Sequence, residues 1–409
     1  MSVQTEIDRI ITAVGAAYDA VEAKGGTAPA AQTIEGLAGA ISGIKSAPAT
    51  PYMEAEYVAV EDGFGNTSHC IKRAKLYNHT AIYTKEFGGQ DKLQNLDFSD
   101  ASNNITAIES NAFEYALVNG LVLPNTISVL GPACFAYANI TTLAIPPLVT
   151  VLSDKAFAYI QPVYNTGTWE ELPINIILPQ NLTKIGNGCF EGSLIRQIAI
   201  PNTVTEIGDR AFYYCEHLAS ITLPLSLQKI SDRVFAQCTS LTSITIPAAV
   251  TEIGVDAFAG SGLTSITIPS TVTVLGSGAF YSCESLTSMD IQANVTVIPD
   301  YFALECPLTS LTLPNTLQTI GESAFIKASG FQVTELTIPA SVTSIGTNAF
   351  GSNYANQMTL TVLPTTPPTL GRNAFSLATG SVIKVPAASV AAYKAATNWS
   401  SYADYIVGV

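Results

Sequence analysis

The sequence has few of the side chains that enzymes use most often for acid–base chemistry and metal binding. Only three histidines, His69, His79 and His217, occur among 409 residues, and none shares a helical i, i+4 spacing with a glutamate. The seven cysteines include no CxxC pair, which argues against a zinc site. We therefore predict no enzyme activity, no metal and no cofactor, and we interpret His69 and His79, which flank Cys70, as surface histidines.

Charge is scarce as well, and positive charge most of all. Only 12% of the residues are charged, whereas 47% are hydrophobic, and 18 Lys and Arg face 32 Asp and Glu for a formal net charge of −14. Because nucleic-acid binding depends on neutralising phosphates with Lys and Arg, this balance excludes a nucleic-acid partner. The sequence also lacks an apolar run of about eighteen residues, so we expect no membrane insertion. It lacks a basic region followed by an apolar core near residue 1, so we predict no secretory signal peptide.

What the sequence does contain is one short string repeated many times. A clear copy is residues 241–258, LTSITIPAAVTEIGVDAF. Its first part alternates polar and apolar residues, which predicts a short strand that Pro247 ends. VTEIG then predicts a second extended segment, with a turn at Gly254 and an irregular or single helical turn before Phe258. The phenylalanine recurs mostly every 22 or 23 residues, at Phe113, Phe135, Phe157, Phe190, Phe212, Phe235, Phe258, Phe280, Phe302, Phe325, Phe350 and Phe375.

A unit of this length cannot bury its own apolar residues and must stack against its neighbours. The repeat therefore predicts a curved solenoid of about twelve coils of 22–25 residues, each with a β-strand and irregular or short helical turns. From Leu93 to the C-terminus the pattern LTSITIPxxVTxIGxxAFxxC resembles the BspA-like branch of the bacterial leucine-rich repeat proteins. That resemblance implies extracellular adhesion and binding of a protein or glycan on microbial surfaces, and it brings no catalytic residues.

The rest of the chain divides into smaller parts. We predict a helical hairpin with apolar stripes at residues 1–45 and a linker at 46–52. Residues 53–92 are predicted to form a β-rich adaptor or cap, with strands at 56–60 and 80–84. The solenoid then covers 93–385, and a helical C-terminal cap covers 386–409. A two-helix hairpin cannot bury both apolar faces alone. It could cap the first coil, self-associate, or dock on a larger assembly.

The hairpin segment EIDRIITAVGAAYDAVEAKGGTAPAAQTIEGLAGAISGI is similar to N-terminal segments of phage and prophage tail-associated proteins. The similarity implies contacts with other tail proteins through residues 1–45, a homo-oligomer with a trimer favoured, and a virion protein made in the cytoplasm and released by lysis. Such a protein needs no export signal. The alternative is a location on the bacterial cell surface or secretion.

Two surfaces are candidates for binding. An insertion lengthens the step from Phe157 to Phe190 to 33 residues and places aromatic rings beside carboxylates, which suits stacking on a sugar. The polar strand positions form the second candidate, since stacked coils align them into hydroxyl ladders. Either feature could instead be structural, the insertion folded back on the solenoid and the ladder serving solubility. The candidate residues are Tyr159, Tyr164, Trp169, Glu170 and Glu171 in or beside the insertion, and Ser243, Thr245, Ser265 and Thr267 on the strands.

The cysteines follow the register of the repeat. Cys215, Cys238 and Cys283 each lie three residues after a repeat phenylalanine, which favours small buried thiols in a repeated niche. The odd total fits no closed disulfide framework, although a bridge between Cys215 and Cys238 on adjacent coils stays open.

Together these patterns predict a non-enzymatic surface-recognition protein. The favoured function is a receptor-binding protein of a phage or prophage tail whose solenoid binds a surface protein or glycan on a bacterial or host cell. The alternatives are a bacterial cell-surface adhesin of the BspA-like type, and a structural spacer or assembly protein without a ligand of its own.

Overall fold

The computed structural model describes residues 52–61, 67–77, 79–90, 95–100, 103–118, 121–162, 174–327, 332–351 and 357–409. The chain divides into two units, Met1–Tyr52 and Met53–Val409. The predicted hairpin at 1–45, the linker up to residue 51 and the inserted segment 163–173 lie outside the described residues.

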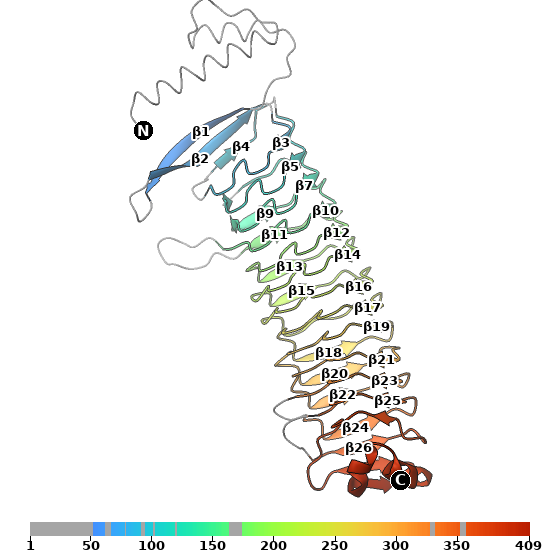
Figure 1. The fold of residues 1–409 in the computed structure, drawn as a ribbon. Helices are drawn as coiled ribbons and strands as arrows, with labels where there is room; N and C mark the ends of the chain where they lie inside the picture. The colour runs from blue at the N-terminus through green and yellow to red at the C-terminus, as the bar shows by residue number, and fades with distance from the viewer. Residues whose placement is uncertain are drawn as a thin grey trace, which may run out of the picture. The chain divides into compact units, whose positions relative to one another are not determined.

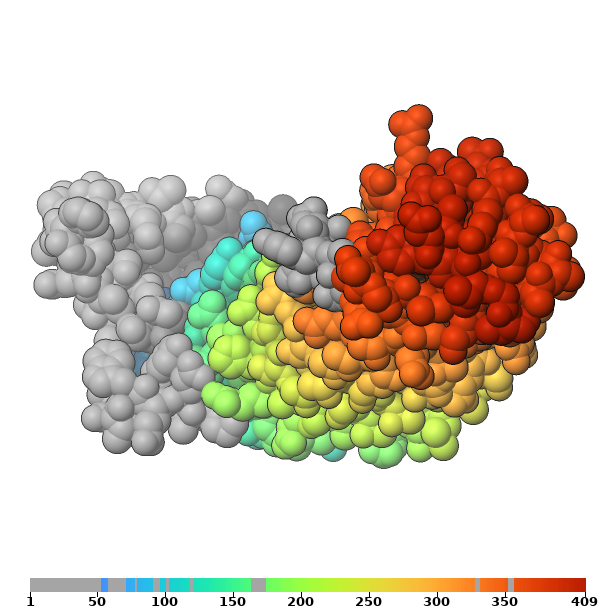
Figure 2. Space-filling view, turned by 90° about the horizontal axis from the view of Figure 1, so that it is seen from below, coloured from blue at the N-terminus to red at the C-terminus, as the bar shows by residue number. Residues whose placement is uncertain are grey.

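The unit Met53–Val409 is a β-solenoid of about thirteen coils with few helices, which confirms the predicted fold class. Figure 1 shows its strands in two columns, with β9, β11 and β13 in one and β10, β12 and β14 in the other. Successive coils form adjacent bands of colour in Figure 2, as expected where each coil contacts mainly its sequence neighbours. The column of longer strands contains β2 (Thr67–Tyr77), β4 (Asn95–Asp97), β9 (Thr142–Ala144), β11 (Asn175–Ile177), β13 (Gln197–Ala199), β15 (Ser220–Thr222), β18 (Ser265–Ile268), β20 (Ser288–Ile291), β22 (Ser310–Thr312), β24 (Glu335–Ile338), β26 (Thr359–Val362) and β28 (Val382–Val385).

The second column consists of strands of only two residues. Where neighbours pair they do so in parallel and in repeat register, so that Glu252 lies beside Val274 and Ile253 beside Leu275. This column contains β3 (Ala81–Ile82), β5 (Ala107–Ile108), β7 (Val129–Leu130), β10 (Val151–Leu152), β12 (Lys184–Ile185), β14 (Glu206–Ile207), β16 (Lys229–Ile230), β17 (Glu252–Ile253), β19 (Val274–Leu275), β21 (Val297–Ile298), β23 (Thr319–Ile320), β25 (Ser344–Ile345) and β27 (Thr369–Leu370). A short third ladder joins β6 (Leu117–Val118) to β8 (Asn139–Ile140).

The longer strands form because their sequence alternates. In β18 the side chains of Ile266 and Ile268 are buried while Ser265 and Thr267 are exposed, as a strand with one buried face requires. Residues 241–246 carry the same alternation but form no strand, so the strand predicted there is wrong. The segment 241–246 still has a backbone hydrogen bond to the next coil, in which Thr264 N donates to Thr242 O at 3.1 Å. The longer-strand column is therefore interrupted between β15 and β18.

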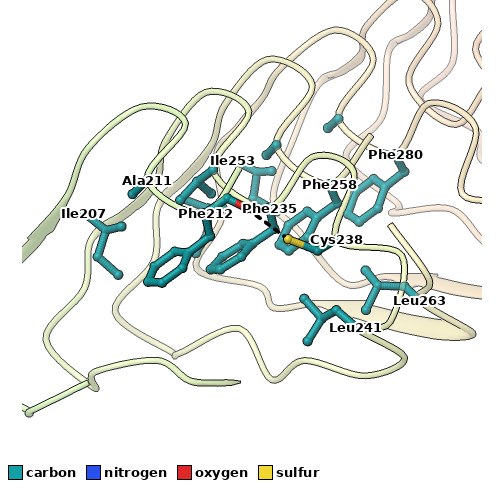
Figure 3. Packing of buried hydrophobic residues seen from close by; sticks show 14 of the residues in the cluster. Ile207, Ala211, Phe212, Phe235, Cys238, Leu241, Ile253, Phe258, Leu263 and Phe280 are labelled. Carbon is teal, nitrogen blue, oxygen red and sulfur yellow. Dashed lines mark hydrogen bonds between the residues drawn. The ribbon is translucent and has the colours of Figure 1, made fainter. Parts of the chain in front are cut away.

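A column of stacked phenylalanine rings fills the interior. Phe258 is fully buried, and its ring centroid lies 5.6 Å from that of Phe235 and 5.3 Å from that of Phe280 (Figure 3). The column also includes Phe87, one coil before the first repeat phenylalanine that the sequence pattern identifies, with its ring 5.3 Å from Phe113. The sequence missed Phe87 because its step of 26 residues carries no LPxxVTxIG pattern.

The first coil lies within residues 53–92, which we predicted as a β-rich cap. It consists of β2, β3 and Phe87, and β1 (Tyr52–Glu61) lies beside β2 in a sheet with β4. The sequence did not predict β2, because Ala74 and Leu76 are its clearest alternating apolar positions and three basic residues surround them. His79 is buried rather than at the surface, so that prediction is wrong. Its Nε2 lies 2.8 Å from Glu86 Oε1 and its Nδ1 lies 2.9 Å from Tyr77 O.

The glycine in the IG pair allows neighbouring coils to approach, rather than making the turn that we expected. A Cβ on Gly254, which follows Ile253, would lie 2.8 Å from Asp232 N and 2.9 Å from the carbonyl carbon of Ser231, which is a steric clash with backbone. The turn instead uses left-handed residues two before and two after the phenylalanine. Around Phe258 these are Asp256, with φ of 53°, and Gly260, with φ of 67°.

The six described cysteines are all free and buried. The thiol of Cys238 donates to the carbonyl of Phe212 at 3.1 Å (Figure 3), and that of Cys215 donates to Phe190 O at 3.0 Å. In the coil of Phe190 a hydroxyl takes the same place, since Ser193 Oγ donates to Phe157 O at 2.6 Å. Cysteine therefore serves here as a small buried donor to the preceding coil.

These thiols should be unreactive in the folded chain. In a Cys70→Ser variant, which leaves six cysteines, we expect no labelling by a disulfide reagent at pH 8 and complete labelling in denaturant. The thiolate is the reactive form, and burial raises the pKa of Cys238 to about 12. At Cys283 burial is opposed by hydrogen bonds with Cys306 and Ser261, which lower the pKa, so protection of that thiol depends on its having no exposed surface. Colorimetric thiol counting checks this, and rapid labelling of native protein would contradict the buried position of the cysteine column.

The C-terminal segment closes the last coil. It comprises η1 (Ala387–Ser389), α3 (Val390–Ala395), η2 (Trp399–Tyr405) and β29 (Ile406–Gly408), which pairs in parallel with β28. Trp399 is fully buried, its ring centroid lies 6.0 Å from that of Phe375, and its Nε1 donates to Pro368 O at 2.8 Å. Tyr393 OH donates to Pro364 O at 2.7 Å. The segment thus covers apolar surface that a further coil would otherwise bury.

Candidate binding surface

The exposed face of the longer strands is a polar surface in register. Ser265 lies beside Ser288, and Thr267 lies beside Asp290. Ser288 and Asp290 continue in turn to Ser310 and Thr312 of the next strand. The ladder expected from the repeat is therefore present from β18 to β22. All four of the predicted strand residues, Ser243, Thr245, Ser265 and Thr267, are exposed, but Ser243 and Thr245 lie in the interruption rather than in a strand.

A groove of about 450 Å³ opens in this face where the longer-strand column is discontinuous. Strand β11 belongs to a sheet with β9, and β13 belongs to a separate sheet with β15. The groove runs over β11, β13 and β15, and we call it the strand-face groove. Its polar lining residues are Asn175, Gln180, Gln197, Ser220 and Thr222, and its apolar ones include Ile177 and Ile221.

The lining of the strand-face groove is polar but uncharged among the residues that the structure describes. Asn and Gln amides both donate and accept hydrogen bonds, and Ser and Thr hydroxyls do the same. Ile177 adds apolar contact because half of its surface is exposed. Such a lining can hold a neutral polar ligand or a polypeptide surface, and it offers no general acid or base. The sequence indicates that the repeat is irregular here, because the insertion within the long step to Phe190 ends directly before β11, but it could not show that β11 and β13 belong to separate sheets.

Tyr159 lies apart from the strand face. It follows Phe157 by two residues, and its ring stacks on Tyr137 with centroids 4.9 Å apart. Its hydroxyl donates to Glu191 Oε1 at 3.0 Å, and burial together with this carboxylate raises the pKa of Tyr159 to about 12. Among the described contacts, none joins Tyr159 to the four strand residues. Tyr164, Trp169, Glu170 and Glu171 lie outside the described residues.

The described residues contain neither a cluster of metal-binding side chains nor a helix suited to a membrane. That part of the chain holds no group of three or more His, Cys, Asp or Glu side chains placed to bind a metal ion. Within the same residues, no helix combines the length and the apolar character needed to cross a membrane.

The coils are short and pair in parallel, they bury columns of leucine, isoleucine and phenylalanine, and they leave a polar strand face open. These features define a leucine-rich repeat protein. The chain belongs to the BspA-type leucine-rich repeat family, whose model matches residues 62–166, 170–287 and 273–392 in six copies. Proteins of this family are typically non-enzymatic binding proteins. A comparison with curated protein sequences finds no match.

Three solved structures illustrate the likeness. A leucine-rich repeat protein from Bacteroides ovatus is 20% identical with a TM-score of 0.50, and the match covers 87% of this chain and 98% of that one. A leucine rich cell surface protein from Faecalibacterium prausnitzii is 19% identical with a TM-score of 0.39, covering 73% and 91% respectively. The pneumococcal vaccine antigen PcpA is 15% identical with a TM-score of 0.44, covering 85% and 80%. At these identities the Bacteroides ovatus protein supports the fold alone.

Proposed function

We propose that this protein is a non-enzymatic surface-recognition protein whose strand-face groove binds a protein or glycan on a bacterial or host cell. The observation that carries the proposal is the groove itself, an opening of about 450 Å³ in the strand face whose polar side chains are uncharged. Membership of the BspA-type family supports the same role.

In its finer form the proposal is a receptor-binding protein of a phage or prophage tail. Residues 1–45 would join other tail proteins and assemble the chain as a homo-oligomer, with a trimer favoured. The support is the similarity of this segment to tail-associated proteins. Capsid and tail genes beside the coding sequence would favour this form. Their absence, with a monomer in light scattering, would overturn it.

The family match favours a second candidate, a BspA-like adhesin on the bacterial cell surface or secreted. The two candidates share the binding surface and differ in what residues 1–45 attach to. Immunogold labelling of producing cells and of particles released on lysis separates them, since an adhesin labels intact cells and a tail protein labels particles.

Removing two hydrogen-bonding side chains from the strand-face groove should weaken whole-cell binding. We expect the double variant Gln197→Ala/Thr222→Ala to lose about tenfold in affinity, because hydrogen bonds contribute about 0.5–1.5 kcal/mol each. A labelled full-length chain titrated against intact cells measures this. The matched control is Ser310→Ala/Thr312→Ala, which removes hydroxyls from the same face in β22, outside the groove.

Each result of this experiment has a distinct meaning. If Gln197→Ala/Thr222→Ala bound cells as tightly as Ser310→Ala/Thr312→Ala, the strand-face groove would not be the binding site. Absence of binding by the unmodified chain to every bacterial and host cell tested, and to a glycan array, would favour the structural spacer.

A further inference from the structure

A second groove lies on the turn side of the solenoid. It has a volume of about 560 Å³ and shares no lining residue with the strand-face groove. It spans the coils from Phe212 to Phe302, and we call it the turn groove. Its larger lining side chains are Tyr213, Arg233, Gln237, Asp256, Tyr281 and Tyr301.

Two left-handed glycines lie at the turn groove, Gly278 in its lining and Gly260 next to the lining residue Ala259. The left-handed position two residues after the repeat phenylalanine carries a tyrosine in several coils, including Tyr137 and Tyr214, but it is glycine at Gly260. The left-handed position two residues before Phe280 is likewise a glycine, Gly278.

Polar side chains of the preceding coils lie across both glycines. A Cβ on Gly260 would lie 2.3 Å from Gln237 Nε2, and one on Gly278 would lie 2.3 Å from Asp256 Oδ1. Gln237 and Asp256, which both line the groove, therefore occupy the space that side chains at these two positions would need.

The charges in the turn groove are paired with each other. Arg233 Nε and Nη2 donate to Asp256 Oδ2 at 3.1 and 3.0 Å. Both side chains stay partly exposed, at 43% and 28%, so each can make further hydrogen bonds. Because the guanidinium already faces a carboxylate and the whole chain is acidic, the groove does not favour a phosphate or another anion.

Backbone N–H groups around the turn groove already donate hydrogen bonds to the next coil. Gly260 N donates to Tyr281 O at 2.7 Å, Phe280 N donates to Phe302 O at 2.8 Å, and Ser282 N donates to Leu304 O at 2.8 Å. These bonds join one coil to the next, so no run of free backbone groups remains to pair with an extended peptide. Recognition here depends on side chains.

We propose that the turn groove binds a neutral saccharide. The rings of Tyr281 and Tyr301 are 42% and 44% exposed and offer apolar faces for the C–H groups of a sugar ring. Gln237, Arg233 and Asp256, on the two coils before these tyrosines, supply donors and acceptors for hydroxyl groups. Aromatic faces beside a few convergent polar groups form a typical small-ligand site. This site is additional to the strand-face groove and does not depend on it.

Titration of the full-length chain with maltohexaose, cellohexaose, chitohexaose and mannohexaose tests the proposal. Calorimetry or saturation-transfer NMR should detect at least one of the four with a dissociation constant of about 1 mM or lower. For that saccharide, Tyr281→Ala and Gln237→Ala should each weaken binding about tenfold, as expected for loss of a ring contact or of well-placed hydrogen bonds. Both substitutions truncate partly exposed or surface side chains, and circular dichroism confirms that each variant is folded.

The controls separate this site from the strand-face groove. Val274→Ala and Val297→Ala shorten exposed side chains of β19 and β21 outside the turn groove and should leave saccharide affinity unchanged. Gln197→Ala/Thr222→Ala should also leave it unchanged, even if that variant loses cell binding. Absence of binding by all four saccharides would overturn the proposal. The proposal would also be overturned if Tyr281→Ala and Gln237→Ala bound the saccharide as tightly as the unmodified chain does.

Discussion

Phe258→Ala is expected to lower the free energy of unfolding by about 3–5 kcal/mol, the usual cost of truncating a buried phenylalanine. Phe258 has no exposed surface and stacks between Phe235 and Phe280. Its removal therefore leaves a cavity against two rings rather than one. In a solenoid the loss also weakens the interfaces with both neighbouring coils, since nearest-neighbour contacts carry most of the stability.

Denaturant titration followed by circular dichroism measures the effect. The matched control is Val255→Ala in the same coil, where 41% of the side chain is exposed and a change within about 0.5 kcal/mol is expected. Phe258→Leu refills part of the cavity and should lie between the two, which keeps the test informative if the alanine variant fails to fold. A loss below about 1 kcal/mol for Phe258→Ala would contradict the stacked column as the main source of stability.

Trp399→Ala is the second large effect that we expect, again about 3–5 kcal/mol. The indole is fully buried against Phe375 and Tyr393, and its N–H donates to Pro368 O at 2.8 Å. Truncation removes this hydrogen bond and leaves the Pro368 carbonyl without that donor. It also opens the end of the phenylalanine column to water.

The location of the damage distinguishes the cap from the interior. Hydrogen exchange should speed up in β26 to β29 in Trp399→Ala, whereas Phe258→Ala should affect the central coils. Val409→Ala serves as control, because 67% of that side chain is exposed at the same end. Uniform acceleration along the whole solenoid in Trp399→Ala would show that the C-terminal segment does more than seal the last coil.

The interior of the solenoid could be predicted from the sequence because it is periodic. Phe258 and its equivalents recur at one position of the repeat, and a column of buried rings follows once the units stack. The sequence did not predict Phe87 as a member of this column, because the strands around it lack the repeat pattern. The strand predicted at residues 241–246 was wrong, since alternation requires a paired neighbour before it becomes a strand.

The candidate sites could be predicted only in part. The exposure of Ser265 and Thr267 follows from period-two alternation, so sequence is enough to place them on the polar face. The strand-face groove lies where β11 and β13 belong to separate sheets, and no residue pattern records that break. Tyr159 was selected for its neighbours in sequence, but its hydroxyl is bound to Glu191 on the next coil.

Sequence alone therefore determined the repeat, the identity of the buried columns and the class of fold, because each depends on contacts that one period reproduces along the chain. Only the tertiary structure decided where the surface is hollowed. In the turn groove, Gln237 and Asp256 lie against the left-handed glycines Gly260 and Gly278 of the coils that follow them. Such a depression depends on differences between adjacent coils, and those differences meet only after the coils have stacked.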